Sequence, residues 1–224
     1  MTASKDPEPF AIKDCTLMPV ATGIIVQSLK EMRDSLATVH AGSIYHHFWG
    51  ALMRHRFDEP EYNNDFARWV DEELRDETLA ERLAVIDPTD FGDLESLRQH
   101  LIDVIEERLD EVQRSAWVPA HKAFHFVRSQ IVVFDTRRRI TIPEELVPVV
   151  PTISETSVFY HFIDARRRTP TGEDDFRVWI TKFGDTYESL RNELALIDPY
   201  FGTLAEVRQK LADVFENYSG RRSS

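Results

Sequence analysis

An internal repeat constrains this chain more than any other feature of its sequence. Residues 10–110 and 124–218 carry the same landmarks in the same order. Four aligned blocks hold 20 identical residues in 34 positions, whereas unrelated segments match at roughly one position in fifteen. The blocks start at Ser43 and Ser157, Asp65 and Asp175, Leu83 and Leu194, and Phe91 and Phe201. A period of about 110 residues is too long for a solenoid and predicts a duplicated domain.

Two repeat units and two short tails are therefore expected. The predicted units are residues 10–115 and 116–218, related by a pseudo-two-fold axis. Residues 1–9 are polar and contain two prolines, so they are predicted to be a disordered N-terminal tail. Residues 219–224 are predicted to be a frayed C-terminal tail.

Each unit opens with strand-like residues and continues with helices. Phe10–Leu17 and the stretch from Phe124 to Phe134 are each predicted to enter a turn and return as a hairpin. A lone hairpin is marginal in water, so the strands of the two units are expected to join in one antiparallel sheet. About five amphipathic helices follow in each unit, so the predicted fold class is helix-dominant α+β.

Capping residues predict where several of these helices begin. Ser28 and Thr203 are each followed three residues later by glutamate, which is the spacing of a capping box. The predicted N-caps are, in chain order, Ser28, Ser43, Asp65, Ser157, Asp175 and Thr203.

The aligned histidines His47 and His161 are the first candidate site residues. Each lies on the apolar stripe of its predicted helix and is expected to face inward. Imidazole is a common metal ligand and a common general acid or base near neutral pH. With carboxylates from Asp65 and Asp175, the pair would form a metal-binding or catalytic site near the pseudo-two-fold axis.

A structural interpretation of the same residues is favoured. Shared packing is the first reason for a residue to persist in both copies, and each histidine would then bond to the aspartate of its own copy. The chain has no H-E-x-x-H or C-x-x-C spacing that would indicate a metal site.

Two arginine clusters at matching positions are the second candidate site. Arg54 and Arg56 follow the first histidine helix, and residues 166–168, all arginine, follow the second. Arginine binds carboxylate and phosphate groups through two parallel hydrogen bonds. The predicted residues for a small anionic ligand between the halves are Arg54, Arg56, Arg166, Arg168, His47 and His161. The simpler interpretation is that these cations oppose helix dipoles at helix C-termini.

Composition excludes several classes of function. The formal net charge of −12 argues against nucleic acid or an anionic membrane as partner, because both need a basic surface. No apolar run approaches the roughly 20 residues that span a bilayer, and the N-terminus lacks the apolar stretch of a secretory signal. The single cysteine, Cys15, aligns with Ser129 and is predicted to be a structural residue in a reducing cytoplasm. Glycine-rich phosphate loops and nucleophile motifs are missing from the sequence, so no cofactor is expected.

Four landmarks resemble a bacterial family of unknown function whose members are usually called hypothetical proteins. They are Ser43–Phe48, Asn64–Trp69, Leu79–Leu83 and Ile86–Pro88. The resemblance covers nearly the whole chain, with the second copy the more degenerate, and it implies no activity.

A non-enzymatic binding or regulatory protein of the cytoplasm is the favoured function, with a small anionic ligand between pseudo-symmetric halves. One alternative is a metal-dependent hydrolase that uses His47, His161, Asp65 and Asp175. The other is a structural module that holds a protein partner or a second copy of the chain.

Overall fold

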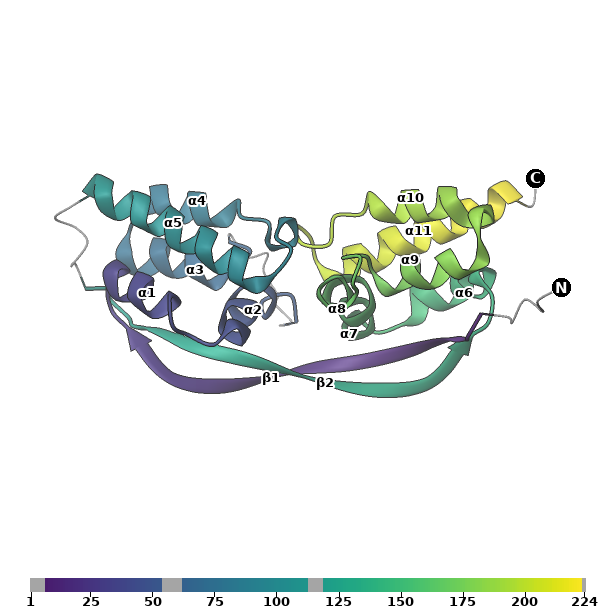
Figure 1. Ribbon diagram of the computed structural model, residues 1–224, viewed down its shortest axis with the longest axis horizontal. Coiled ribbons are helices and arrows are strands. Elements are labelled where there is room, and N and C mark those ends of the chain that lie inside the picture. Colours follow the sequence, from purple (N-terminus) through teal and green to yellow (C-terminus); the bar gives the residue numbers. More distant parts are fainter. Residues whose placement is uncertain (1–6, 54–61, 113–118, 223–224) are drawn as a thin grey trace. The chain divides into compact units, whose positions relative to one another are not determined.

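The structure combines two long strands with many short helices. It is a computed structural model that describes residues 7–53, 62–112 and 119–222 (Figure 1). The helices and strands are β1 (Phe10–Val26), α1 (Leu29–Leu36), α2 (Ala41–Trp49), α3 (Asp65–Trp69), α4 (Glu77–Ala84), α5 (Leu94–Val112), β2 (Phe124–Ile140), α6 (Leu146–Val149), α7 (Glu155–Val158), α8 (Ala165–Arg168), α9 (Asp175–Ile180), α10 (Glu188–Ala195) and α11 (Leu204–Arg222). Two π-helical segments, η1 (Val70–Leu74) and η6 (Phe159–Asp164), extend α3 and α7. The predicted helix-dominant α+β class is confirmed.

The two strands are continuous and pair with each other in a two-stranded sheet. The Thr22 hydroxyl donates to the carbonyl oxygen of Phe126, and the Thr136 hydroxyl donates to that of Ile12. The residue number rises from Ile12 to Thr22 along β1 while it falls from Thr136 to Phe126 along β2, so the pairing is antiparallel. The expectation that both strands join in one sheet is confirmed, whereas the predicted hairpins are wrong.

Each strand has a single left-handed residue near the predicted turn. Gly23 has φ +79° and Arg137 has φ +62°. A type I′ hairpin turn needs two such residues in succession, whereas a type II′ turn needs only one, so these residues are compatible with the predicted turns. In the structure each disturbs its strand only locally, and the apolar residues beyond it continue the same strand.

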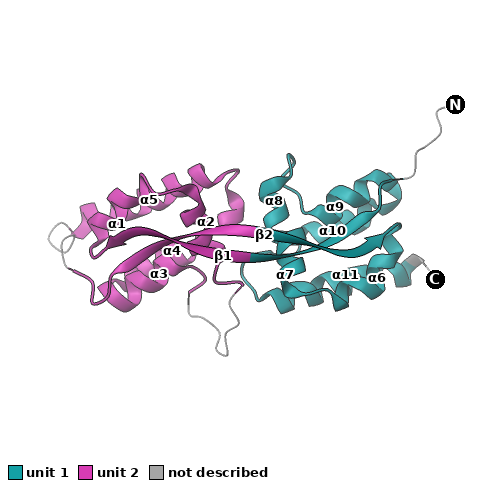
Figure 2. Cartoon of the chain, turned by 90° about the horizontal axis from the view of Figure 1, so that it is seen from below, with its two compact units in different colours: residues 1–16, 132–224 teal, residues 17–131 magenta. Residues whose placement is uncertain are grey.

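The chain divides into two compact units within its strands (Figure 2). Unit 1 is Met1–Thr16 with Val132–Ser224, and unit 2 is Leu17–Ile131. Each strand therefore gives its first half to one unit and its second half to the other. This division differs from the predicted boundary at residue 115, because the start of β2 packs with the preceding helices and the start of β1 packs with the helices that follow β2.

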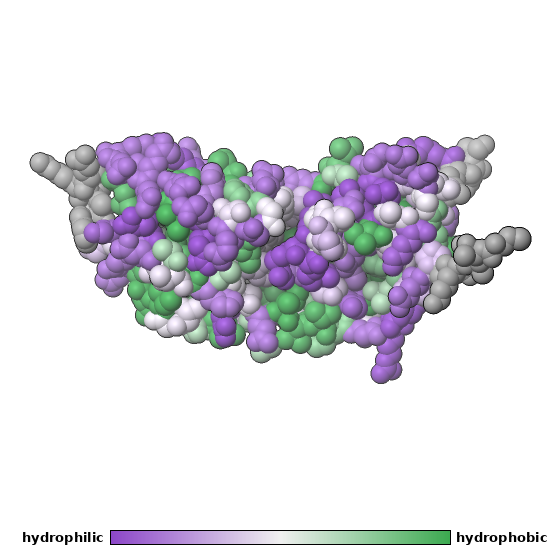
Figure 3. Space-filling view, in the orientation of Figure 1, coloured by the Kyte–Doolittle hydropathy of each residue, from purple (hydrophilic) through white to green (hydrophobic). Residues whose placement is uncertain are grey.

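Each unit has its own apolar core, and the outer helix surfaces are mainly hydrophilic (Figure 3). Fully buried side chains of unit 2 include Leu36, Ile44, Phe48, Phe66, Leu83 and Leu101. Those of unit 1 include Val150, Val158, Phe162, Phe176, Leu194 and Leu211. Most of these residues follow the helical spacing of apolar positions in the sequence, as expected for the buried faces of amphipathic helices. In the part of the chain that the structure describes, no helix is long and apolar enough to cross a membrane.

Several predicted helix ends shift by a few residues. His40 caps α2 and Ser154 caps α7, so Ser43 and Ser157 are buried inside these helices and are not N-caps. The capping box at Thr203 is confirmed, since Thr203 and Glu206 exchange side-chain-to-backbone hydrogen bonds. The predicted tail at residues 219–222 is instead the last turn of α11.

The N-caps of α3 and α9 are Asn64 and Asp174, one residue before the predicted caps. Their side-chain oxygens accept hydrogen bonds from Ala67 N and Arg177 N. Asp65 and Asp175 are therefore first residues of their helices, and neither caps its helix. This correction matters for the site, because it leaves both carboxylates to contact side chains.

Candidate functional site

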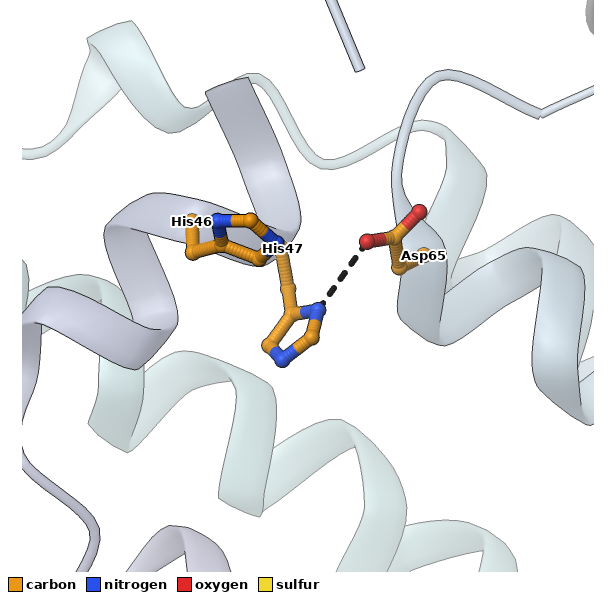
Figure 4. A group of neighbouring side chains, drawn as sticks. All are labelled: His46, His47 and Asp65. Carbon is orange, nitrogen blue, oxygen red and sulfur yellow. Dashed lines mark hydrogen bonds and ion pairs between the residues drawn. The ribbon is translucent and has the colours of Figure 1, made fainter. Parts of the chain in front are cut away.

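His47 is a buried side chain of α2 with a hydrogen-bond partner on each ring nitrogen. Its Nδ1 atom lies 3.0 Å from Oδ2 of Asp65 (Figure 4). Its Nε2 atom lies 3.1 Å from the backbone nitrogen of Val127, at the start of β2. The ring is 3% exposed and touches the aromatic rings of Phe66 and Phe124. The imidazole thus connects a helix, its neighbouring helix and a strand within unit 2.

The strand contact fixes the tautomer of this histidine. A backbone N–H can only donate, so Nε2 of His47 must be the unprotonated, accepting nitrogen. The ring proton then sits on Nδ1 and is donated to Asp65. Both ring nitrogens are engaged in this neutral form, and a second proton would face the N–H of Val127.

Unit 1 contains the same arrangement around the aligned histidine. His161, in η6, lies 2.8 Å from Oδ2 of Asp175 through Nδ1. Its Nε2 atom accepts a 2.8 Å hydrogen bond from the backbone nitrogen of Lys13, at the start of β1. The residue is 2% exposed, and burial lowers the pKa of His161 against the opposing effect of Asp175. The neutral tautomer argued for His47 therefore applies here too.

In each unit a tryptophan also ties a helix to the residues just before a strand. Trp69 donates its indole N–H to the carbonyl oxygen of Lys122, and Trp179 donates to that of Glu8. The predicted bond of each histidine to its own aspartate is present. The sequence did not reveal the strand contacts, because they join positions more than fifty residues apart.

A polar hollow of about 330 Å³ lies beside His47 in unit 2. Its polar lining includes His46, Asp65, Arg68, Glu72, Glu73 and Lys122. Glu72 and Glu73 belong to the π-helical segment η1, and such segments occur frequently at functional sites. His46, Arg68 and Lys122 were not predicted as site residues, since none of them aligns with the same residue in the other half of the sequence.

Two polar contacts organise the walls of this hollow. Arg68 donates to Oδ1 of Asp65 at 2.6 Å, so this carboxylate bridges Arg68 and His47. His46 Nδ1 lies 2.7 Å from the hydroxyl of Ser129 on β2. Lys122 is 84% exposed in its side chain, with its ammonium 3.8 Å from Glu73. The lining therefore mixes cationic and anionic groups.

The aligned positions in unit 1 carry different chemistry. His46, Arg68 and Glu73 of unit 2 correspond to Tyr160, Val178 and Phe183. Phe183 packs on Trp179 with ring centroids 4.9 Å apart. A broader hollow of about 1100 Å³ lies against Lys182 and Phe183, and its described lining includes neither His161 nor Asp175. The buried histidine contact is common to both units, whereas the polar surroundings are not.

The second arginine cluster is engaged by carboxylates of its own unit. Arg168 donates to Asp164 at 2.7 Å and to Asp175 at 3.1 Å, and its guanidinium lies 4.0 Å from the centre of the Tyr160 ring. Arg167 donates to the fully buried Asp164. Arg166 lies over the Phe162 ring. An external anion at Arg168 would have to compete with two carboxylates.

The first arginine cluster is not part of the described structure. Arg54 and Arg56 lie outside the described residues, so their predicted role as ligand-binding residues stays a prediction.

His46, His47 and Asp65 form a group that could in principle hold a metal ion (Figure 4). One ligand atom from each lies within 4.8 Å of the others. A metal-bound imidazole, however, normally donates its other ring N–H to an acceptor. At His47 that nitrogen faces the N–H of Val127, which is a donor. A metal on Nδ1 of His47 would require a proton on Nε2, and that proton would face the N–H of Val127. The tautomer of His47 that the strand contact requires is therefore unsuited to metal binding.

Cys15 is a buried residue of β1 in unit 1. Its thiol contacts the carbonyl oxygen of Thr156, and burial raises its pKa to about 12. A thiol with so high a pKa forms little thiolate near neutral pH, so Cys15 is a poor nucleophile. This agrees with the predicted structural role.

These features define a helix-rich α+β protein with a polar hollow in unit 2. This fold class does not by itself imply an activity. The chain belongs to the family of unknown function DUF5752, which matches residues 7–216. The expected resemblance to a family without assigned activity is thereby confirmed.

One solved structure supports the fold over almost the whole chain. The protein is similar to OrfY from Thermoproteus tenax, with a TM-score of 0.82 and 26% sequence identity. The alignment covers 96% of this chain and 98% of that chain. A comparison with curated proteins found no match.

Proposed function

We propose that this chain is a non-enzymatic binding protein that holds a small polar molecule in the hollow of unit 2. The observation that carries the proposal is the polar lining beside the Asp65 carboxylate, at positions where unit 1 has Tyr160, Val178 and Phe183. A volume of about 330 Å³ falls at the lower end of the range for small-molecule sites.

The chain is, in this proposal, a tandem duplication in which only one copy keeps a binding site. Matching contacts support the duplication: each unit has a buried histidine bonded to an aspartate and to a strand N–H. These contacts serve the fold of both units. The binding function then belongs to residues that differ between the units. His47 and His161, which were predicted as site residues because they are repeated, are structural residues in this proposal.

The ligand class follows from the charges around the hollow. His46, Arg68 and Lys122 supply donors for one carboxylate or phosphate group. Glu72 and Glu73 line the same hollow and repel a second anionic group, so they favour hydroxyl or amino groups at the other end of the ligand. We therefore propose a small molecule with one anionic group and several hydrogen-bond donors. Cys15, unpaired and buried, supports a reducing cytoplasm as its compartment.

The metal-dependent hydrolase is less well supported. Both of its histidines accept a hydrogen bond from a strand N–H, which leaves neither Nε2 atom available to a metal. His47 belongs to unit 2 and His161 to unit 1, and each is already bonded to the aspartate of its own unit.

Titration calorimetry with a panel of small carboxylates, sugar phosphates and nucleotides tests the binding function. Lys122→Ala removes an exposed donor without disturbing the core, and we expect about fivefold weaker binding of any ligand that responds. Lys182→Ala is the control, because Lys182 is also an exposed lysine but lines the separate hollow of unit 1. Equal weakening by both variants, or no saturable binding by the wild-type protein, would contradict the proposal.

A second function, contact with a protein partner, is favoured by two exposed apolar side chains. Val85 and Leu196 occupy aligned positions at the ends of α4 and α10, and they are 75% and 85% exposed. Because both side chains are exposed, packing within a unit does not require them, and their recurrence at aligned positions favours contact with another molecule. If a second copy of this chain is the partner, light scattering should show a dimer that the double variant Val85→Ser and Leu196→Ser loses.

A further inference from the structure

Asp174 is a fully buried carboxyl group at the N-cap of α9. One carboxyl oxygen, Oδ1, accepts a 2.9 Å hydrogen bond from Arg177 N and caps the helix. The other, Oδ2, has no hydrogen-bond partner among the residues that the structure describes. A buried polar atom without a partner is costly, and a buried charge costs more.

The corresponding residue of unit 2 shows what is missing. Asn64 caps α3 in the same way, since its Oδ1 accepts from Ala67 N at 2.9 Å. Its amide nitrogen also donates a 2.9 Å hydrogen bond to the carbonyl oxygen of Leu83. Leu83 aligns with Leu194 in unit 1. An ionised Asp174 can only accept, so it cannot make the second of these two bonds.

A protonated carboxyl group restores the missing donor, because its O–H takes the place of the amide N–H. We propose that Asp174 holds a proton in the folded chain and donates it to the carbonyl oxygen of Leu194, which makes the N-terminus of α9 sensitive to pH. The proton is exchanged reversibly with solvent.

The charged groups near Asp174 do not neutralise it. Arg177 Nη1 lies 4.0 Å from Oδ2, beyond hydrogen-bond distance, while Arg177 Nη2 donates to Glu173 at 2.6 Å. Arg191, from the packed helix α10, lies 3.7 Å from the same Glu173. Arg166 of α8 attracts the carboxylate from a distance. Burial outweighs the Arg177 N–H and both arginine charges, and it raises the pKa of Asp174 to about 6.

The direction of the pH effect follows from this raised pKa. The folded chain binds the proton more tightly than the unfolded chain, whose carboxyl has a pKa of 3.8. The stabilisation is complete below about pH 4 and is lost as the pH rises through about 6. The difference between the two pKa values corresponds to about a hundredfold change in the folding equilibrium constant. Asp175, the partner of His161, is the next residue, so the same helix end supports the buried histidine.

Reciprocal exchange of the two N-caps tests the proposal. Asp174→Asn should be more stable than the wild-type protein at about pH 8 and gain much less at about pH 5, as measured by urea unfolding. Asn64→Asp should lose stability at about pH 8 and recover part of it at about pH 5. Parallel pH profiles for the wild-type protein and Asp174→Asn would overturn the proposal.

A second measurement keeps the test decisive if a variant does not fold. Carbon-detected NMR of the wild-type protein follows the carboxyl carbon of Asp174 directly. A titration midpoint near pH 6 supports a proton held in the folded chain. A midpoint at or below the ordinary value of 3.8 shows that the carboxylate is ionised throughout, which overturns it.

Discussion

At the scale of a single residue, the buried neutral His161 of unit 1 contributes stability that is lost on acidification. Burial lowers the pKa of His161, so the folded chain takes up a proton less readily than the unfolded chain. An unfolded imidazole protonates near pH 6.5, so the stabilisation is present above that pH and declines as the pH falls below it. His161→Gln should cost about 2 kcal/mol at neutral pH and less at about pH 5, where the stabilisation by the neutral imidazole has declined. The contribution of Asp174 is common to both proteins and cancels in this difference.

Urea unfolding between about pH 5 and pH 8 measures this effect. His125→Gln is the control, because His125 is an exposed residue of β2 and its replacement should keep the wild-type pH profile. An equal cost of His161→Gln at both pH values would contradict the assignment to this residue.

The left-handed residues of the two strands should differ in their response to substitution. A Cβ atom at Gly23 meets no atom within 4 Å, so the cost of Gly23→Ala is conformational and should be about 1 kcal/mol. Arg137 already accepts this strain, and Arg137→Gly should change stability by less than about 0.5 kcal/mol. Thermal unfolding compares both with Gly92→Ala, whose Cβ also meets no atom and whose φ is not left-handed. An equal loss in Gly23→Ala and Gly92→Ala would show that strand conformation is not the cause.

The ends of helices set stability at the scale of elements. Thr203 accepts a hydrogen bond from Glu206 N and donates its own N–H to the Glu206 carboxylate. Thr203→Ala removes the first of these bonds at the start of α11 and should lower the free energy of unfolding by about 1 kcal/mol. Lys210→Ala, at an exposed position of the same helix, should have little effect. Denaturant unfolding that gives the same value for both variants would count against the cap.

Element types were predictable from the sequence, whereas strand partners were not. Periodic apolar residues indicated the helices, and the capping box at Thr203 marked the start of α11. The strands were mistaken for hairpins, because Gly23 and the polar run at Arg137 have the composition of turns. Tertiary pairing decides between a turn and a bulge, and no local pattern carries that information.

The candidate site shows the same division. The inward-facing His47 and its bond to Asp65 could be expected from one helix stripe and one repeated aspartate. The hollow could not be predicted, because Lys122, which lies just before β2, is far along the chain from Arg68, although both line the hollow. A search for repeated residues also turns attention away from positions at which the copies differ.

At the scale of the whole molecule, the strand halves decide which fragment of the chain can fold. Unit 2 is Leu17–Ile131, and it needs Val127 N for His47 and the carbonyl of Lys122 for Trp69. A fragment of residues 17–131 should therefore unfold cooperatively. The fragment of residues 10–115, which follows the repeat boundary, lacks both contacts and should not fold.

Circular dichroism and proton–nitrogen NMR spectra of the two fragments check this expectation. Cooperative melting with dispersed amide signals is expected of residues 17–131 alone. Equal stability of the 10–115 fragment would mean that the start of β2 is dispensable to unit 2.

The exchange of strand halves also has an evolutionary consequence. Lys13 donates to His161 across 148 positions of sequence. Loss of the strand segment around Lys13 would leave the buried imidazole of His161 without its backbone donor. The helices of each unit thus depend on a strand segment from the other end of the sequence, so a substitution in a strand acts on helices far away along the chain. Under the proposed duplication, this mutual dependence preserves both halves together, even while the hollow beside His47 and the surroundings of His161 differ in chemistry.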